Sequence, residues 1–212
     1  MNYPDYERLY ARYLQSGPGP LIKLAGDLTG KVVFDLCAGG GRLSEEVLKY
    51  HPAMVVAIDE DFDMVSYCVN GCRVINGGLP EALLETQRMI GSLADVAFCQ
   101  QAINYWLKGH AAKMLHGAMT PGGLFIFNTF NKKPSHTPQT KNYTLDGHDF
   151  TEVSWLLDQD TVYHVQIRSG LPPHANTFMW LSPERIFEVM SPFFEVESFV
   201  NGNTTLYRCT SK

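Results

Sequence analysis

Three successive glycines follow an acidic residue in the stretch DLCAGGGRLS, which spans residues 35–44. The stretch comes directly after the apolar run Val32-Val33-Phe34. Glycine inside a regular element costs about 0.5–1 kcal/mol relative to alanine, so three in a row need a reason. A turn of this kind lets backbone amides approach a ligand, and the helix that follows favours negative charge at its N-terminus. The pattern therefore predicts a ligand-binding turn between a strand and a helix.

A second acidic residue, Asp59, closes the next apolar run, Met54 to Ile58. In an open parallel sheet, ligands bind beyond the carboxyl ends of the strands, where an acidic residue accepts hydrogen bonds from ribose hydroxyls. Gly39, Gly41 and Asp59 together thus predict an adenosine-containing cofactor. The alternative for Asp59 alone is the N-cap of a following helix.

Asp35 separates two classes of adenosine cofactor. Against the dinucleotide fingerprint G-x-G-x-x-G, residues 39–44 lack the third glycine, because Ser44 stands in its place. A carboxylate at the mouth of the turn repels a pyrophosphate, whereas it attracts the ammonium and sulfonium of S-adenosylmethionine. Asp35 therefore favours S-adenosylmethionine, and a nicotinamide-dependent oxidoreductase is the competing class of enzyme.

Strand-like and helix-like runs alternate five times up to residue 128, which predicts a doubly wound α/β sheet. The expected strands are 31–37, 54–58, 72–75, 95–99 and 124–128. The expected helices are 3–15, 21–28, 42–49, 63–69, 81–90 and 103–115. Residues 119–123 are expected to form a turn before the fifth strand, because they contain Pro121-Gly122-Gly123.

The pattern changes after residue 130. Two strand-like runs, 149–157 and 161–168, flank Asp158-Gln159-Asp160 and predict a hairpin. Ser182-Pro183 opens a last helix, with serine as N-cap and proline at the first position. A closing hairpin is expected from residues 194–210, around Asn201-Gly202-Asn203.

Composition restricts the protein class. The chain has 212 residues, of which 45% are hydrophobic, and a net charge of −5. A chain of this size forms one globular domain and buries roughly 70% of its unfolded surface. The acidic balance argues against non-specific nucleic-acid binding, which needs a basic face. The basic residues that do cluster are Lys132, Lys133 and Lys141.

The five cysteines are an odd number and contain no C-x-x-C pair, so no structural metal is predicted. Free buried thiols indicate a reducing compartment. No apolar run approaches the ~18 residues of a membrane span. The N-terminal residues lack the apolar core of a signal peptide. A soluble, cytoplasmic protein without membrane contact is therefore expected.

From about residue 28 to the end, the chain resembles the class I S-adenosylmethionine-dependent methyltransferases. VVFDLCAGGGRLS is similar to their first motif and VVAIDEDFDMV to the acidic motif of their second strand. LADVAFCQQAINYW is similar to the fourth-strand motif, and MTPGGLFIFNTFN to the turn and fifth strand. FFEVESF and TTLYRCTS match the final reversed hairpin of that fold. The resemblance implies a Rossmann-like, doubly wound, mostly parallel seven-stranded sheet with a terminal antiparallel hairpin and an inserted antiparallel substrate-capping region.

The resemblance also implies roles for single residues. Asp35 and the backbone of Ala38 to Gly41 hold the methionine end of S-adenosylmethionine, and S-adenosylhomocysteine is the product. Asp59 binds the ribose hydroxyls, and Glu60 and Met64 flank the adenine. Gln100 faces the methionine moiety or the substrate entrance, and the backbone of Leu79 replaces an acidic residue that many members use near the adenine. The implied cofactor residues are Asp35, Ala38, Gly39, Gly41, Asp59, Glu60, Met64, Leu79, Gln100 and Tyr10.

The domain organisation follows from this resemblance. A single methyltransferase domain spans residues 1–212, with residues 1–20 as a helical lid that carries Tyr10. Ordinary packing is the alternative for the tyrosines of this helix. Residues 131–180 resemble the capping piece of small-molecule methyltransferases, including amino-sugar N-methyltransferases.

The capping region carries the candidate catalytic residues His174, His164 and Tyr143. An amine nucleophile must be neutral and a hydroxyl needs a general base, a role open to one of the histidines. Each histidine taken alone is more often structural. The sequence does not choose between nitrogen, oxygen and carbon as the acceptor.

The expected activity is methyl transfer to a small molecule, by in-line displacement. Many methyltransferases that act on nucleobase or glutamine amino groups have Asn-Pro-Pro-Tyr or Asp-Pro-Pro-Tyr after the fourth strand. This chain has Gln100-Gln101-Ala102-Ile103 there, which argues against a nucleobase substrate. A tRNA, rRNA or protein methyltransferase and a non-catalytic S-adenosylmethionine-binding protein are the alternatives. A homodimer is compatible with the sequence.

Overall fold

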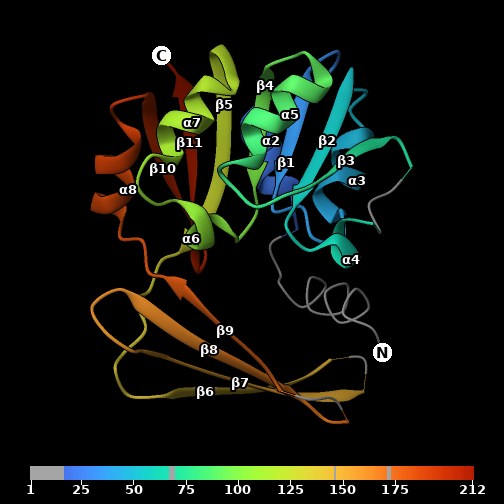
Figure 1. The fold of residues 1–212 in the computed structure, drawn as a ribbon. Helices are drawn as coiled ribbons and strands as arrows, with labels where there is room; N and C mark the ends of the chain where they lie inside the picture. The colour runs from blue at the N-terminus through green and yellow to red at the C-terminus, as the bar shows by residue number, and fades with distance from the viewer. Residues whose placement is uncertain (1–16, 67–69, 146, 171–172) are drawn as a thin grey trace.

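The computed structural model describes residues 17–66, 70–145, 147–170 and 173–212. Tyr10, Cys68 and the helix expected at 3–15 lie outside these residues. The chain forms two sheets, a large one covered by helices and a smaller one at its edge (Figure 1).

The larger sheet has seven strands in the order β10-β11-β5-β4-β1-β2-β3. The first five strands in chain order pair in parallel, and β11 lies antiparallel to β5 and to β10. The strands are β1 (Val32–Leu36), β2 (Met54–Asp59), β3 (Cys72–Asn76), β4 (Ala94–Cys99), β5 (Met119–Phe130), β10 (Phe194–Asn201) and β11 (Thr204–Ser211). The predicted doubly wound sheet and its closing antiparallel hairpin are confirmed.

Helices cover both faces of this sheet. They are α2 (Gly19–Ala25), α3 (Arg42–Leu48), α4 (Phe62–Val65), α5 (Ala82–Ile90), α6 (Ile103–Trp106), α7 (Ala111–Gly117) and α8 (Pro183–Met190). Side chains alternate between the faces along each strand. Phe34 therefore packs in the core beneath α5, α7 and α8, whereas Val33 packs in the core beneath α2 and α3.

Two predictions within this part of the chain are wrong in detail. The helix expected at 103–115 is interrupted between α6 and α7, because Leu107 leaves the helical conformation with ψ 77° and Gly109 has φ 52°, which a right-handed helix does not accommodate. The turn expected at 119–123 is the irregular beginning of β5, whose register against β4 shifts between Ala94 and Val96. Gly122 at φ 74° allows the strand to continue through this irregularity.

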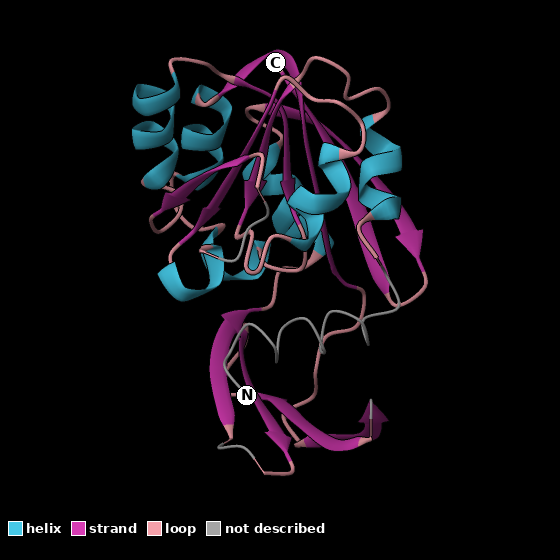
Figure 2. Ribbon diagram, turned by 90° about the vertical axis from the view of Figure 1, so that its right-hand side faces the viewer, coloured by secondary structure: helices cyan, strands magenta, loops and turns pink. Residues whose placement is uncertain are grey.

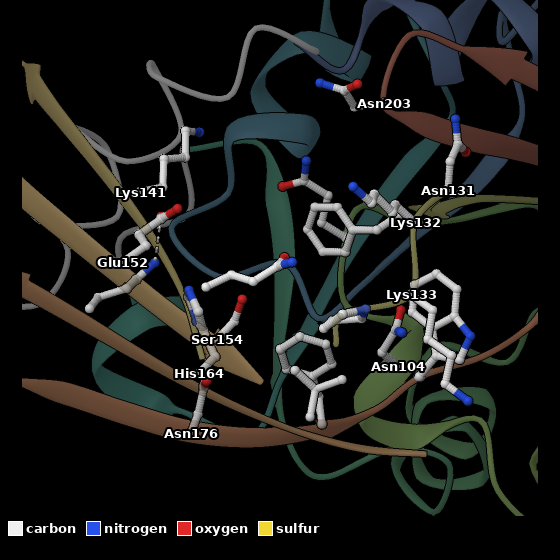
Figure 3. Close-up of a pocket in the computed structure, with 18 of the residues that line it drawn as sticks. Asn104, Asn131, Lys132, Lys133, Lys141, Glu152, Ser154, His164, Asn176 and Asn203 are labelled. Atoms are coloured by element: carbon white, nitrogen blue, oxygen red, sulfur yellow. Dashed lines mark hydrogen bonds between the residues drawn. The ribbon is translucent and has the colours of Figure 1, made fainter. Parts of the chain in front are cut away.

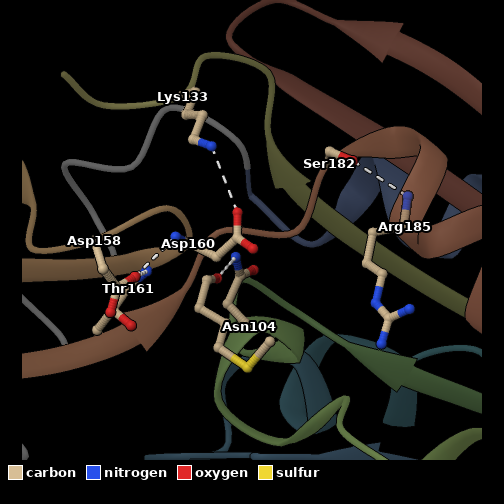
Figure 4. Close-up of polar contacts among 8 residues, drawn as sticks. Asn104, Lys133, Asp158, Asp160, Thr161, Ser182 and Arg185 are labelled. Carbon is tan, nitrogen blue, oxygen red and sulfur yellow. Dashed lines mark hydrogen bonds and ion pairs between the residues drawn. The ribbon is translucent and has the colours of Figure 1, made fainter.

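The smaller sheet is antiparallel, with the order β6-β7-β8-β9. Its strands are β6 (Gln139–Leu145), β7 (His148–Leu156), β8 (Thr161–Arg168) and β9 (His174–Met179). The predicted β7–β8 hairpin is confirmed, and Asp158 closes it by accepting hydrogen bonds from the amides of Asp160 (2.9 Å) and Thr161 (2.7 Å) (Figure 4). The sequence did not predict β6 and β9, because their polar residues, as in QTKNYTL, hide the apolar alternation of a strand.

Polar contacts join α6 to β9 and hold the two sheets together. Nδ2 of Asn104 donates to the carbonyl oxygen of Met179 over 2.6 Å, and Nδ2 of Asn176 donates to the Tyr105 hydroxyl over 2.9 Å. The Tyr105 and Phe178 rings meet edge to face at 5.7 Å. Figures 1 and 2 show the smaller sheet below the larger one, beyond α6. Among the described residues, none of the helices has the length and apolar character that crossing a bilayer requires.

Candidate active site

The glycine turn predicted after the first strand lies between β1 and α3. Gly39 has φ 52° and Gly41 has φ 80°, both left-handed conformations that glycine adopts at little cost. Gly41 is the N-cap of α3, and its amide donates to the carbonyl of Ala38 over 2.9 Å. The amide of Gly39 donates to Oδ2 of Asp59 over 2.8 Å. The turn after β1 is thereby fastened to the end of β2.

Asp59 is half-buried at the carboxyl end of β2. Its Oδ1 accepts a hydrogen bond from the amide of Asp61 over 2.9 Å, and its carbonyl accepts one from the amide of Gly77 over 2.9 Å. Burial raises the pKa of the Asp59 carboxyl, and the hydrogen bonds from Asp61 and Gly39 act in the opposite direction.

Asp59 fits the ribose-binding role that the sequence predicts. An ionised carboxylate offers about four acceptor positions on its two oxygens. The backbone amides of Gly39 and Asp61 take one position on each oxygen. Acceptor capacity therefore remains for the two hydroxyls of a ribose.

Asp35 lies beneath the turn, with 2% of its surface exposed, and not in its open mouth. Its Oδ2 accepts hydrogen bonds from the amide (3.0 Å) and the hydroxyl (2.7 Å) of Ser44 in the first turn of α3. The carboxylate therefore holds the start of α3 against the end of β1. In the turn above it, a hydrogen bond with the Cys99 thiol and burial raise the pKa of the Cys37 thiol, and the negative charge of Asp35 acts in the same direction.

The other predicted cofactor residues lie at the same edge of the sheet. Ala38 continues from β1, and its amide donates to the carbonyl of Ile58 over 3.0 Å. Glu60 is exposed after β2, whereas Met64 is buried in α4. Leu79 is half-buried after β3 and packs against the large core. Eight of the predicted cofactor residues therefore lie at or near the carboxyl ends of β1, β2 and β3: Asp35, Ala38, Gly39, Gly41, Asp59, Glu60, Met64 and Leu79.

Gln100 and Gln101 follow β4 directly. Gln100 is half-buried, whereas Gln101 lines a cavity whose described lining contains none of the predicted cofactor residues. The amide of Gln101 donates to Oδ1 of the buried Asn128 over 2.9 Å, and Gln101 has φ 59°. The sequence predicted Gln100 as the site residue after β4, whereas the structure places its neighbour Gln101 in the cavity wall. The left-handed conformation of Gln101 could not be predicted from the sequence.

A cavity of about 730 Å³ lies between the carboxyl ends of β4 and β5 and the smaller sheet (Figure 3). The loop after β5 and the turn between β10 and β11 line one side of it, and strands β6 to β9 line the other. Its charged and titratable lining residues are Lys132, Lys133, Lys141, Glu152, His164 and His174.

Much of the inner face of the smaller sheet is polar, whereas the row Leu156, Val162 and Phe178 on the same face is apolar. Two cross-strand rows of side chains face the cavity, because every second residue of a strand points to the same side. One row is Gln139, Ser154, His164 and Asn176, and the next is Lys141, Glu152, Gln166 and His174. A sheet usually turns apolar side chains inward, so two polar rows beside an apolar one indicate a place for a ligand that has both polar and apolar parts.

The predicted catalytic residues divide between the wall of this cavity and its margin. His164 and His174 line it. Tyr143 stacks on Phe150 at 5.2 Å, and its hydroxyl donates to Oε1 of Glu152 over 2.9 Å. Burial lowers the pKa of His164, and the nearby Glu152 carboxylate and Asn176 side chain act in the opposite direction.

Sequence reasoning missed Glu152. An acidic residue within a strand of alternating residues was the signal that could have indicated it. The three lysines, which the sequence showed as a basic cluster, all line the cavity. Lys133 also forms an ion pair with Asp160 of the β7–β8 turn, at 3.4 Å (Figure 4). Among the described residues, no group of three metal-ligating side chains is present.

Solved structures share this arrangement of two sheets. A S-adenosylmethionine-dependent methyltransferase from Clostridium acetobutylicum superposes with a TM-score of 0.74 over 99% of this chain and 98% of its own, at 15% identity. The chain has the fold of S-adenosylmethionine-dependent methyltransferases. The predicted resemblance in fold is thereby confirmed.

Two sugar-modifying enzymes are also similar in structure. The S-adenosylmethionine-bound amino pentose methyltransferase CalS10 from Micromonospora echinaspora superposes with a TM-score of 0.72, at 13% identity, over 100% of this chain and 98% of its own. The sugar N-methyltransferase KedS8 from Streptoalloteichus has a TM-score of 0.73, at 10% identity, over 100% of this chain and 93% of its own. At these identities, the likeness shows the fold. No protein-family model and no curated protein matches the sequence.

Proposed function

We propose that the protein is an S-adenosylmethionine-dependent methyltransferase that acts on a small molecule. The observation that carries this proposal is the adjacency of two features at one sheet edge. One is the turn in which Gly39 is bonded to Asp59, and the other is the cavity over β4 and β5, which both polar and apolar side chains line. The first suits an adenosine cofactor and the second suits an acceptor.

The cofactor would be held by the residues at the ends of the parallel strands. Asp59 would bind the ribose hydroxyls, and the backbone from Ala38 to Gly41 would bind the methionine end. Glu60, Met64 and Leu79 would surround the adenine, with Gln100 and Tyr10 completing the site. The bound cofactor supplies an electrophilic methyl group on a sulfonium, which leaves as a neutral thioether.

The protein would contribute chiefly alignment and exclusion of water. Effective alignment lowers a bimolecular barrier by up to ~7–11 kcal/mol in favourable cases. Residues 131–180 would cap the acceptor, and the N-terminal residues 1–20 would act as a lid. His164 is suited to take a proton from the acceptor, because burial keeps its imidazole neutral. His174 and Tyr143 are further candidates for this role.

The cavity favours a small molecule over a nucleic acid or a protein. Its volume of about 730 Å³ falls in the ~300–1,000 Å³ range of small-molecule sites. Lys132, Lys133 and Lys141 line this cavity, so their charge is directed at its contents. The amino pentose and sugar substrates of the structurally similar enzymes point to a polar acceptor.

Thermal unfolding with S-adenosylmethionine, S-adenosylhomocysteine and NAD tests the cofactor. A ligand at 100 times its dissociation constant stabilises the native state by ~2.7 kcal/mol, which raises Tm by roughly 5–10 °C for a chain of this size. We expect this shift with the two adenosyl ligands, its loss in Asp59→Ala, and no shift with NAD.

A shift with NAD alone would instead indicate an oxidoreductase. Absence of any shift would contradict the proposed cofactor. If the adenosyl ligands do bind, release of S-adenosylhomocysteine in the presence of an acceptor would exclude the alternative of a protein that binds the cofactor without turnover.

A further inference from the structure

Glu152 is the one acidic side chain among the described residues that line the cavity. It lies on β7, half-buried, in one of the polar rows of the inner face. Its Oε1 accepts hydrogen bonds from the Tyr143 hydroxyl over 2.9 Å and from Nε2 of Gln166 over 3.4 Å. Two donors from the neighbouring strands therefore hold the carboxylate in one position.

Other titratable groups face Glu152 from every neighbouring strand. Lys141 lies opposite it on β6, next to Tyr143. On the other side are His164 of β8, whose pKa Glu152 raises, and His174 of β9. Lys141 is therefore a cation on the strand beside this half-buried carboxylate, and Glu152 is the group that attracts a further cation into the cavity, because a buried charge costs free energy unless it is paired.

A further acceptor of the cavity wall lies one row away. Oδ1 of Asn176 is buried without a hydrogen-bond partner, while Nδ2 of the same side chain donates to Tyr105. Asn176 lies directly opposite His164 in the strand register, and both line the cavity. Buried acceptors of this kind normally have a donor, so a ligand is the natural source of one.

We propose that Glu152, His164 and Asn176 bind the amino group of the substrate, so that the methyl acceptor is an amine. This inference rests on the proposed function. The three side chains offer three acceptors, which match the three N–H groups of an ammonium, whereas a hydroxyl has a single proton to donate. The carboxylate supplies the negative charge that selects the ammonium over a neutral hydroxyl.

The same three groups account for activation of the amine. An ammonium is not nucleophilic, because its lone pair holds a proton. The neutral imidazole of His164 takes that proton, and the nitrogen lone pair then forms the new bond to the methyl carbon of the sulfonium cosubstrate. The electrons of the broken carbon–sulfur bond stay on sulfur, the product is an N-methyl ammonium, and the imidazolium releases its proton to water.

A matched pair of probes tests the inference. D-Glucosamine and D-glucose differ by one amino group in place of a hydroxyl, and their binding is measured by calorimetry with S-adenosylhomocysteine present. We expect glucosamine to bind the wild type and glucose to bind at least tenfold more weakly. The variant Glu152→Gln, which keeps the shape and removes the charge, should bind glucosamine about 10- to 100-fold more weakly, as loss of a charged hydrogen bond predicts.

Two further variants complete the test, the first as a control and the second as a change that acts through Glu152. Glu195→Gln makes the same change at an exposed position of β10, outside the cavity, and should bind glucosamine as the wild type does. Tyr143→Phe keeps the ring on Phe150 and removes the hydroxyl that holds Glu152, so binding should weaken severalfold. The shift in Tm with S-adenosylhomocysteine shows that each variant is folded.

Equal binding of the two sugars, unchanged binding by Glu152→Gln, or no binding of either sugar would overturn the inference. The proposed function is judged separately, by the adenosyl ligand alone. If S-adenosylhomocysteine binds and the amine does not, the amine site is wrong and the methyltransferase proposal stands. If no adenosyl ligand binds, the proposed function itself is wrong.

Discussion

The amide of Gly39 and the carboxylate of Asp59 form a hydrogen bond of 2.8 Å between the turn after β1 and the end of β2. The bond fixes the position of the turn relative to the acidic residue proposed to bind the ribose. It requires Gly39 at φ 52°, which brings the amide to the carboxylate. The proposed cofactor site therefore depends on the conformation of this one turn.

Gly39→Ala should weaken S-adenosylhomocysteine binding at least tenfold and lower the free energy of unfolding by about 1–2 kcal/mol, the cost of a left-handed conformation for an L-residue. Calorimetry and urea unfolding measure the two effects. Gly30→Ala is the matched control, because Gly30 also has positive φ (70°) and open space around it, away from the site. Gly30→Ala should lose stability and keep its affinity for S-adenosylhomocysteine. Equal affinity of the two variants would contradict the proposal that the turn at Gly39 binds the cofactor.

His164 should make stability depend on pH. Burial lowers its pKa in the folded protein below the ordinary value of 6.5. As pH falls through 6.5, the unfolded chain therefore takes up a proton before the folded chain does. The stabilising contribution of neutral His164 is complete above that pH and is lost progressively below it.

Urea unfolding of the wild type and His164→Gln at pH 5, 6, 7 and 8 checks this expectation. The free energy of unfolding of the wild type should fall relative to that of the variant as the pH is lowered. Parallel curves for the two proteins would show that the imidazole is not desolvated in the folded state.

Asn104→Ala should destabilise the protein by about 1–3 kcal/mol, because it leaves a half-buried carbonyl without its donor. The lost bond, from Nδ2 of Asn104 to the carbonyl of Met179, joins α6 to β9 over 2.6 Å (Figure 4). Thermal unfolding measures the loss, with Asn142→Ala on an exposed stretch of β6 as the control. A loss no larger than that of the control would mean that this contact does not hold the two sheets together.

Cys37 should react slowly with iodoacetamide at neutral pH. A hydrogen bond with the Cys99 thiol and burial raise the pKa of Cys37 well above its ordinary value, so little thiolate forms. Mass spectrometry of the native and the urea-unfolded protein compares the rates at this cysteine. Equal rates would contradict the raised pKa.

The parallel sheet could be predicted from the sequence because its signals are local. Apolar runs such as Met54–Asp59, each followed by a turn and an amphipathic run, indicate strand and helix without knowledge of distant residues. Gly109 shows the limit of such signals. The helical spacing of apolar residues continues from 103 to 115, but the backbone is left-handed at Gly109 and the helix is interrupted there. The polar strands β6 and β9 were missed because their side chains face a cavity and not an apolar core.

The sequence by itself determined the α/β architecture, the glycine turn and the acidic residue that ends β2, because adjacent residues encode each of them. The tertiary structure decided that Asp35 bonds to Ser44 beneath the turn, and that Glu152, His164 and Asn176 share one inner face. Those relations depend on strand register and on the docking of one sheet against the edge of another. Register is set by pairing between strands distant in the chain, so it cannot be predicted from any single stretch of residues.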